Sequence, residues 1–350
     1  ASQDLTDAIR ERVTSAYESG TPLHIQGGGS KAFLGNPVTG AALQVTEHCG
    51  IVDYQPAELV ITARAGTLLS EIESKLAEHN QMLPFEPPHF GANATLGGCI
   101  ASGLSGPRRP FAGAARDFVL GMRIINGCGE PLRFGGEVMK NVAGYDLSRL
   151  ITGSMGSLGI IMDVSLKVLP KPSVEKSLAQ PATQTEAIAL MNQLSGQPLP
   201  LSGAYWESGR LVLRLSGAAQ AVSQAVETIG GDPIDDVDFW TRVRELETPF
   251  FDDADRLWRL SLPPATPPLD IERDATVDWG GAQRWLKSEL DADNLRALAA
   301  EAGGHVTLFR GGGADCFQPL SEPLMAIHKR VKYALDPAAI LNPGRLYPDL

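Results

Sequence analysis

Residues 27–31 read GGGSK and follow the short run PLHIQ (22–26). Three consecutive glycines leave a stretch of backbone without side chains, and a lysine puts one positive charge at its end. Taken alone, such a cluster has two interpretations: a tight surface turn, or a loop against which a phosphate group lies. Other segments of the chain are needed to distinguish between these two interpretations.

The glycine loop does not fit the two common nucleotide-binding motifs. Residues 27–32 satisfy the dinucleotide pattern G-x-G-x-x-A, but that pattern must open a helix, and here the glycine- and proline-containing FLGNPVTG (33–40) follows. A P-loop is excluded because the GK[ST] ending after four spacers is missing. We therefore favour an anion nest, in which successive N–H groups and a nearby ammonium bind a pyrophosphate.

Two further glycine clusters support the phosphate interpretation. Small residues fill GANATLGGCIASGLSG (91–106), and glycine recurs over 153–159. The interior of a strand or helix gains little from such a composition, so we predict that 91–106 is a loop whose backbone closely approaches another group. Three such clusters are harder to explain as unrelated turns than one.

Composition and charge limit the class of protein. The chain has 350 residues, of which 43% are hydrophobic and 20% charged, as expected for a globular protein of roughly two domains. Its net charge of -11 disfavours nucleic acid and anionic lipid as partners. The four cysteines (49, 99, 128 and 316) form no CxxC or Cys/His cluster, which argues against a disulfide framework, zinc or an iron–sulfur cluster. With no apolar run long enough for a membrane span and no signal peptide, we expect a cytoplasmic protein.

Periodicity predicts the elements of the first half. We expect a helix over 5–17 ended by Gly20, a strand over 23–26, a strand over 59–66, a helix over 68–76 with Thr67 as N-cap, and a strand over 81–85. The last three form a β-α-β unit, which predicts partly parallel pairing. Residues 118–125 and 131–134 flank Asn126-Gly127 and predict a hairpin, with a short helix and an antiparallel strand at 160–169 after it.

The second half has the pattern of an α+β plait. After a linker at PKPS (170–173), we expect strands near 174–178, 205–215 (a hairpin turning at Ser208-Gly209), 279–287 and 305–309, and helices over 183–194, 218–229 and 291–302. Two β-α-β halves of this kind fit one compact module. Trp240, Trp258, Trp279 and Trp285 lie in this half, and we expect core or interface positions for them.

These segments resemble a known family. QGGGSK, P-x(6)-GANATLGGCIASG, RDFVLGMRIINGCGE, KNVAGYDLSRLITGSMGSLGII and DPAAILNPGRLYP are similar, in order and spacing, to the FAD-binding fold of the vanillyl-alcohol oxidase / p-cresol methylhydroxylase (PCMH) superfamily. KNVAGYDLSRL, WGGAQRWL and HVTLFRGG look most like the GlcE-type subunits of bacterial glycolate oxidases. The resemblance implies an α+β fold: a two-lobed PCMH-type FAD-binding domain (1–172), an α+β plait cap domain (173–325), and a C-terminal segment (326–350) that returns to the FAD domain.

The resemblance also implies an FAD site. Three groups of residues would form it. They are Gly27, Gly28, Gly29, Ser30 and Lys31 at the pyrophosphate; Gly91, Thr95, Leu96, Gly97, Gly98, Ala101 and Ser102 along the phosphates and flavin edge; and Gly153, Gly156, Gly159, Ile160 and Ile161 at the adenosine. Some members of the superfamily attach FAD covalently, but the first loop lacks histidine and Cys99 is better explained as a small buried residue. We expect non-covalent FAD.

The catalytic residues are less evident. Oxidation of a 2-hydroxy acid needs a cation for the carboxylate, a base for the hydroxyl proton and a flavin close to C2. Related dehydrogenases use a histidine-rich metal-binding motif in the cap, whereas GGHVTLFRGGGADC (303–316) contains one histidine, so we expect no metal. Arg310, Arg259 and Arg116 remain for the anion, and His305 or Tyr145 for the proton. Each has a structural alternative, since arginines often pair with carboxylates.

The resemblance implies partners too, because the sequence has no iron–sulfur or haem motif to reoxidise a flavin. In that family a second flavoprotein subunit and an iron–sulfur subunit complete the enzyme, which can be peripheral to the inner membrane through them. Three functions stay open: the FAD subunit of a complex that oxidises glycolate to glyoxylate, a stand-alone FAD-linked 2-hydroxy-acid dehydrogenase, or a non-catalytic flavoprotein scaffold.

Overall fold

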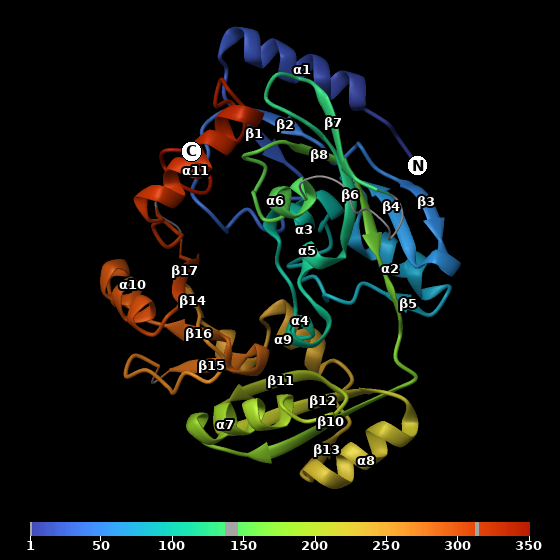
Figure 1. Cartoon of the computed structure of the whole chain (residues 1–350), viewed down its shortest axis with the longest axis vertical. Coiled ribbons are helices and arrows are strands. Elements are labelled where there is room, and N and C mark those ends of the chain that lie inside the picture. Colours follow the sequence, from blue (N-terminus) through green and yellow to red (C-terminus); the bar gives the residue numbers. More distant parts are fainter. Residues whose placement is uncertain (1, 137–145, 273, 312–314) are drawn as a thin grey trace.

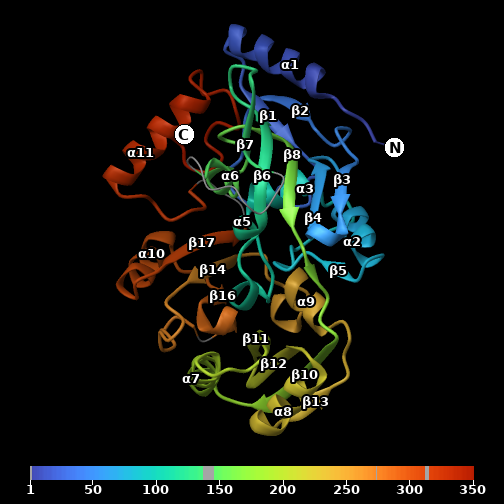
Figure 2. The ribbon, with the colours of Figure 1, turned by 45° about the vertical axis from the view of Figure 1, so that its right-hand side comes forward.

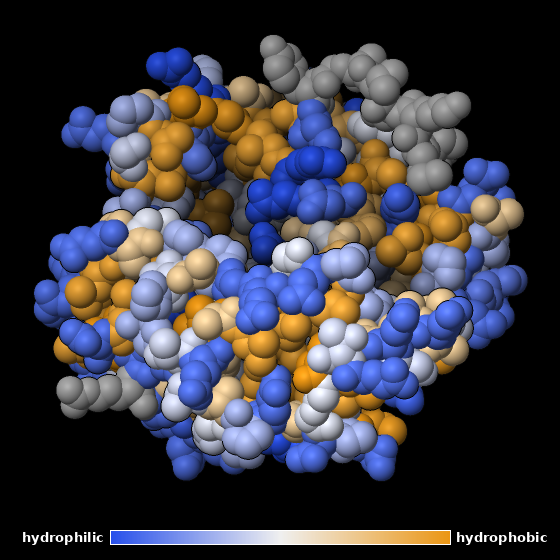
Figure 3. Space-filling view, turned by 60° about the horizontal axis from the view of Figure 1, so that its bottom comes forward, coloured by the Kyte–Doolittle hydropathy of each residue, from blue (hydrophilic) through white to orange (hydrophobic). Residues whose placement is uncertain are grey.

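A computed structural model describes residues 2–136, 146–272, 274–311 and 315–350. The chain forms two lobes (Figure 1), and both termini belong to the upper one. Figure 2 shows the same division from another side, with the helix α9 (Phe239–Glu245) near the junction. The short helix α4 (Arg109–Ala112) also lies near the junction (Figure 1). Hydrophilic side chains cover much of the lower lobe, and the surface is hollowed where that lobe meets the one behind it (Figure 3).

The chain begins with a helix over a parallel strand pair. α1 (Thr6–Ser19) buries Ile9 and Val13 against β1 (Leu23–Gln26) and β2 (Ala41–Gln44). Gly20 ends the helix in the left-handed conformation (φ 65°), which glycine adopts without a steric penalty. The predicted helix, its end and the strand after it are confirmed.

A five-stranded antiparallel sheet forms the rest of the upper lobe. Its strands in spatial order are β3 (Ile51–Gln55), β4 (Val60–Arg64), β8 (Ile160–Lys167), β6 (Val119–Ile125) and β7 (Pro131–Gly135). The predicted β6–β7 hairpin is confirmed, and the Asn126 side chain accepts N–H bonds from Cys128 and Glu130 in its turn. The remaining short elements are η1 (Pro56–Glu58), α2 (Leu69–Ala77), α5 (Ala115–Phe118) and α6 (Leu147–Ile151).

The predicted β-α-β unit is wrong. β5 (Gln81–Met82) pairs with β9 (Leu169–Pro170) in an antiparallel ladder of its own and not with β4. Both edges of β4 are already taken by the antiparallel ladders of β3 and β8, so no parallel neighbour fits there. Thr67 is not the N-cap of α2, because its buried hydroxyl accepts the Gly50 N–H at 2.9 Å and Leu68 is the residue before the helix.

The glycine-rich segment 91–106 contains a helix, contrary to the prediction of a loop. α3 (Leu96–Ser102) begins at Thr95, whose hydroxyl accepts the Gly98 N–H, and ends at Gly103 in the left-handed conformation (φ 63°). Small residues serve close packing here, because a Cβ on Gly97 would lie 2.8 Å from the Cβ of Ala65. Burial against β4 therefore offsets the cost of about 1 kcal/mol that a glycine brings to a helix.

The lower lobe is one eight-stranded sheet whose neighbouring strands pair antiparallel in the described residues. Its strands in spatial order are β13 (Asp232–Ile234), β10 (Val174–Pro181), β12 (Arg210–Gly217), β11 (Leu201–Glu207), β15 (Ala275–Asp278), β16 (Gln283–Lys287), β14 (Leu257–Ser261) and β17 (His305–Arg310). Between them come α7 (Gln184–Ser195), α8 (Ala219–Ile229), η2 (Pro249–Phe251), η3 (Trp279–Gly281) and α10 (Ala292–Glu301).

The strand order confirms the plait. β12 lies between β10 and β11, and β10 lies between β12 and β13, so the first half is a split β-α-β-β-α-β unit. The second half repeats this order except that, among the described residues, no helix lies between β14 and β15. Trp240, Trp258 and Trp285 are buried in core clusters, and Trp279 lies at the lobe junction, where its indole N–H donates to the Gly106 carbonyl at 3.0 Å.

The C-terminal segment returns to the upper lobe. α11 (Glu322–Leu335) leads to a segment in which Leu23 N–H donates to Ile340 O at 2.7 Å and Asn342 N–H to Leu23 O at 3.0 Å. We propose that the FAD-binding domain and the cap meet at 172/173, just before β10. The boundary at 325/326 would fall inside α11, so we propose that the returning segment begins at Glu322.

Candidate functional site

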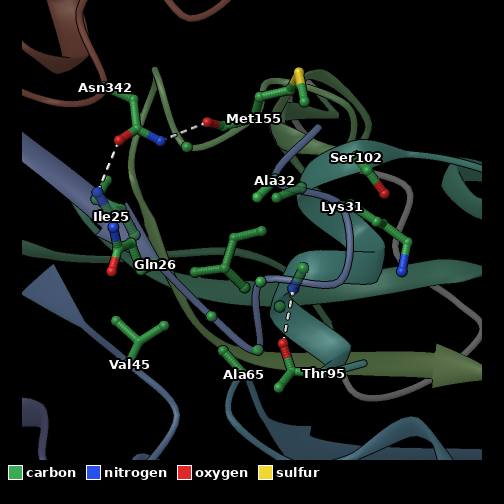
Figure 4. A pocket seen from close by; sticks show the side chains of 18 of the residues that line it. Ile25, Gln26, Lys31, Ala32, Val45, Ala65, Thr95, Ser102, Met155 and Asn342 are labelled. Carbon is green, nitrogen blue, oxygen red and sulfur yellow. Dashed lines mark hydrogen bonds between the residues drawn. The ribbon is translucent and has the colours of Figure 1, made fainter. Parts of the chain in front are cut away.

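A cavity of about 600 Å³ lies in the upper lobe between β1, the glycine loop, α3 and the segment 155–161 (Figure 4). All the residues expected at the cofactor except Gly91, Leu96 and Gly153 line it. They are Gly27, Gly28, Gly29, Ser30, Lys31, Thr95, Gly97, Gly98, Ala101, Ser102, Gly156, Gly159, Ile160 and Ile161. The fold thus brings together segments that are more than a hundred residues apart in sequence.

The three exceptions have other positions. Leu96 is 1% exposed and belongs to the core beneath α3. Gly91 (φ 127°) and Gly153 (φ 87°) occupy turns that residues with side chains rarely adopt, and a Cβ on either would meet no atom within 4 Å. Backbone conformation alone explains these two glycines.

The first two glycine clusters lie directly against each other. A Cβ on Gly28 would fall 1.6 Å from the carbonyl oxygen of Asn93, and one on Gly27 would fall 2.9 Å from the Thr95 hydroxyl. Real Cβ atoms do not approach so closely, so these glycines allow the two loops to pack and form one wall of the cavity.

Gly98 is different, and it supplies the test of whether a cofactor fits. It lies within a helix at negative φ, and a Cβ there would meet only the Thr95 hydroxyl, at 3.3 Å. Conformation does not explain this glycine, and protein packing explains it only in part, since the Thr95 hydroxyl would have to move by a few tenths of an ångström; the close approach of a ligand does explain it. The cavity volume is also within the range of ligand and cofactor pockets, about 300–1,000 Å³. The residues therefore fit a bound dinucleotide.

Several residues of the cavity wall were not expected there from the sequence. Asn342 is the clearest, because its Oδ1 accepts the Ile25 N–H at 2.8 Å while its Nδ2 donates to the Met155 carbonyl at 2.7 Å (Figure 4). One side chain of the returning segment thus ties two walls together. The ILNPG sequence indicated the return but not this role. Gln26 and Arg345 lie in segments that carry the family resemblance but were not expected at the cofactor, and Val45 and Ala65 carried no signal.

Lys31 is already engaged at the cavity edge. The side chain is 8% exposed, and its Nζ donates to the His89 carbonyl at 3.2 Å and to the Ser30 hydroxyl at 3.3 Å. Burial lowers the pKa of Lys31, an effect that Cys99 and Glu245 oppose. An ammonium has three N–H donors, so one remains for a ligand oxygen.

The two arginines expected to bind an anion lie around an aromatic cluster at the lobe junction. The Arg259 guanidinium is 5.6 Å from the ring centre of Phe309, and that of Arg310 is 5.6 Å from the ring centre of Phe33. The ring centres of Phe33 and Phe309 are 5.4 Å apart in edge contact, and Phe33 lies two residues after Lys31, the last residue of the glycine loop. The cluster therefore joins strand β17 of the cap to the segment that follows the glycine loop.

Neither guanidinium has a hydrogen-bond or ion-pair partner among the residues that the structure describes. Burial, and next the charge of Arg109, lower the pKa of Arg259 to about 10, and burial lowers that of Arg310. Both stay cationic at neutral pH. In the described residues, neither Arg259 nor Arg310 pairs with a protein carboxylate, which was the structural alternative to binding an anion.

The other expected catalytic residues are less favourably placed. Arg116 is exposed on α5, and Tyr145 lies outside the described residues. His305 begins β17 opposite Ser261, and burial followed by the Arg259 charge lowers its pKa, which favours the neutral imidazole. In the described ranges, no three His, Cys, Asp or Glu side chains are grouped to hold a metal ion.

A second, much smaller cavity of about 20 Å³ adjoins Arg259 and contains a buried acid. Asp278 is 3% exposed, and its Oδ1 accepts the Trp279 N–H at 2.7 Å. Burial raises the pKa of Asp278 from 3.8 to about 7. At neutral pH this carboxyl therefore titrates, a property that the sequence did not indicate.

We predict that Asp278 makes the folded chain less stable as the pH rises from about 4 to 7, because the folded state holds a proton that the unfolded state has released. Between pH 5 and pH 8 the free energy of unfolding should fall by about 2–3 kcal/mol more in the parent than in Asp278→Asn. Urea unfolding at both pH values measures this. An identical pH dependence in the two proteins would contradict it.

Comparison with known proteins agrees with the geometry. Residues 4–135 match the family described as FAD binding domain. The glycolate oxidase subunit GlcE of Escherichia coli is 50% identical over 347 residues, which cover 99% of each chain. The chain belongs to the GlcE family of glycolate oxidase subunits. Its cofactor is FAD, as the family resemblance implied.

More distant relatives carry the same fold. The glycolate oxidase subunit GlcD of Bacillus subtilis is 31% identical over 175 residues, covering 49% of this chain and 37% of that one. Among solved structures, an alkyldihydroxyacetonephosphate synthase superposes with a TM-score of 0.68 at 15% identity, covering 96% of this chain and 74% of that one. This likeness confirms the α+β fold, and the FAD-binding domain is shown by the family match over residues 4–135. Across the described ranges, no helix has the length and apolarity needed to span a membrane.

Proposed function

We propose that this chain is the FAD-carrying subunit of a glycolate oxidase complex that converts glycolate to glyoxylate. The observation that carries the proposal is the 50% identity to a GlcE subunit along 99% of both chains. The cavity supports it, because its glycine-lined wall and Gly98 in particular suit a dinucleotide that lies directly on the backbone. When bound, FAD supplies the two-electron acceptor that oxidation of a 2-hydroxy acid requires.

We assign the parts of the FAD molecule to the following residues of this chain. N–H groups of residues 28–31 and the third N–H of Lys31 bind the pyrophosphate. Main-chain groups of Gly159 to Ile161 bind the adenosine end. Attachment is non-covalent, because the Cys99 thiol is 1% exposed and its burial raises its pKa to about 12, so it is not a nucleophile at neutral pH.

For the substrate we propose that Arg259 and Arg310 hold the carboxylate. Two guanidiniums without protein partners among the described residues, both at the aromatic cluster of the lobe junction, suit a small anion, and a bidentate Arg–carboxylate pair also fixes its orientation. His305, kept neutral by its surroundings, can accept the hydroxyl proton. Tyr145 stays a second candidate for that step.

Replacement of Arg259 by methionine should reduce kcat/KM for glycolate about a hundredfold in the assembled complex, because a hydrogen bond to a charged group contributes about 1.5–3 kcal/mol. FAD content should not change, since Arg259 does not line the cofactor cavity. Steady-state kinetics and flavin content measure the two effects. Arg330→Met on the exposed face of α11 is the matched control, and equal kcat/KM in the two variants would contradict the assignment.

As partners we propose a second flavoprotein subunit and an iron–sulfur subunit, since a reduced flavin needs an electron acceptor and the sequence supplies no cluster ligands. The curated relative GlcD, also named as a glycolate oxidase subunit, supports the first of these. We further propose a cytoplasmic location, with contact to the membrane only through partners.

Anaerobic titration with glycolate, followed by the visible flavin spectrum, tests the proposal. The subunit proposal predicts that glycolate bleaches the flavin of the complex but not that of the isolated chain. Bleaching of the isolated chain would indicate a stand-alone dehydrogenase. FAD that stays oxidised in both, with unchanged activity of a complex that carries an FAD-free variant, would indicate a scaffold.

A further inference from the structure

The segment 86–91, which connects β5 to α3, has an unusual backbone. Glu86 (φ 46°) and Phe90 (φ 52°) are both in the left-handed region although neither is glycine. Such a conformation costs on the order of 1 kcal/mol per residue and persists only where the surroundings impose it. At Phe90 the contacts that impose it come from the cap.

Glu245, the last residue of α9, stabilises the backbone at the second of these residues, Phe90. Its carboxylate accepts the His89 N–H at 3.1 Å and the Phe90 N–H at 2.7 Å, and the Arg244 Nε donates to it at 2.7 Å. The side chain is 11% exposed, so the three bonds are made largely out of water. A carboxylate of the cap thus fixes two consecutive N–H groups of the FAD-binding domain.

The other side of the same peptide leads to the glycine loop. The His89 carbonyl accepts from Lys31 Nζ at 3.2 Å, and that ammonium also lies 5.7 Å from the ring centre of Phe90. Lys31 lines the cavity, and the Glu245 charge favours its charged form against burial. A continuous path of contacts therefore runs from Glu245 through His89 and Phe90 to Lys31.

We infer that Glu245 is a positioning residue of the cofactor site: through residues 89–90, the cap holds the Lys31 ammonium where it meets the diphosphate. This rests on the proposed function, in which the cavity binds FAD. Because coupling is reciprocal, bound FAD and the contact of α9 with residues 89–90 stabilise each other. FAD affinity then depends on a residue that does not touch FAD.

A double-mutant cycle tests the inference on the full-length chain. The proteins are the parent, Glu245→Gln, Lys31→Met and the double variant, with Glu247→Gln as control because it removes the same charge from an exposed neighbour. FAD is titrated into each apoprotein, Kd is measured by flavin fluorescence, and thermal unfolding of the apo forms is recorded. Glu245→Asp, which keeps the charge but shortens the reach, replaces Glu245→Gln if the latter does not fold.

We expect Glu245→Gln to weaken FAD binding about tenfold and Glu247→Gln to leave it unchanged. The double variant should bind FAD no more weakly than Lys31→Met alone, because Glu245 acts through Lys31. An unchanged Kd for Glu245→Gln, or two effects that simply multiply, would overturn the inference and assign Glu245 to anchoring the cap. Failure of the parent itself to bind FAD would instead overturn the proposed function and this inference with it.

Discussion

Gly98→Val is expected to abolish FAD binding while the chain keeps its fold. A side chain at this position meets one protein atom, the Thr95 hydroxyl at 3.3 Å from the new Cβ, and otherwise extends into the cavity. Replacing a helical glycine costs the helix nothing, since valine has the higher helix propensity. The added methyl groups therefore act on the space that the diphosphate and flavin edge would use.

The measurement is an FAD titration of the apoprotein together with its thermal unfolding. We expect Kd to rise at least a thousandfold and the free energy of unfolding of the apo form to change by less than about 1 kcal/mol. Gly196→Val, at an uncrowded position at the end of α7, is the matched control and should keep FAD. Gly97→Ala should instead destabilise the fold, because its Cβ meets Ala65 at 2.8 Å. Normal FAD content in Gly98→Val would contradict the assignment of the cavity.

Lys332→Met should cause the largest loss of stability. The Nζ of this lysine, whose residue is 5% exposed, donates to Asp336 Oδ2 at 2.7 Å, to Ser157 O at 2.7 Å and to Leu341 O at 2.8 Å. Removing it leaves a buried carboxylate and two carbonyls without their donor, which costs about 3–5 kcal/mol. That is a large part of the total stability of a domain, about 5–15 kcal/mol.

Urea unfolding of the apoprotein measures this loss. Lys329→Met is the matched control, because its ion pair with Asp349 is exposed and contributes about 0–1 kcal/mol. Adding Asp336→Asn to Lys332→Met should recover part of the stability, since the unpaired charge is then gone. If Lys332→Met costs no more than Lys329→Met, the buried network does not hold the returning segment.

Elements with regular periodicity could be predicted from the sequence, and those set by tertiary pairing could not. α1 repeats cleanly, β10, β12 and β17 coincide with predicted strands, and the turn residues Ser208-Gly209 mark a strand end. The plait strands β13, β14 and β15 were not predicted, because they are short and their burial does not alternate regularly. β2 and β3 are short and exposed along most of their length, so they carry little hydrophobic pattern. The partner of β5 depends on which edges of β4 are occupied, which no local pattern reports.

The residues of the candidate site also fall into those that the sequence could predict and those that it could not. The glycine clusters predicted a backbone that closely approaches another group, and the structure brings these clusters together around one cavity. Composition could not distinguish glycines required by packing, such as Gly28, from one that leaves room for a ligand, such as Gly98. Asn342 and Glu245 act through main-chain groups of distant segments, and an ordinary polar residue gives no sign of that in sequence.

The proposed function depends on one claim, that segments distant in the sequence converge to bind the diphosphate of one FAD. The most direct measurement is the flavin content of the chain purified under native conditions. We predict a yellow protein with about one FAD per chain, released when the protein is denatured because no covalent bond holds it. A colourless native protein that does not take up added FAD would contradict the claim.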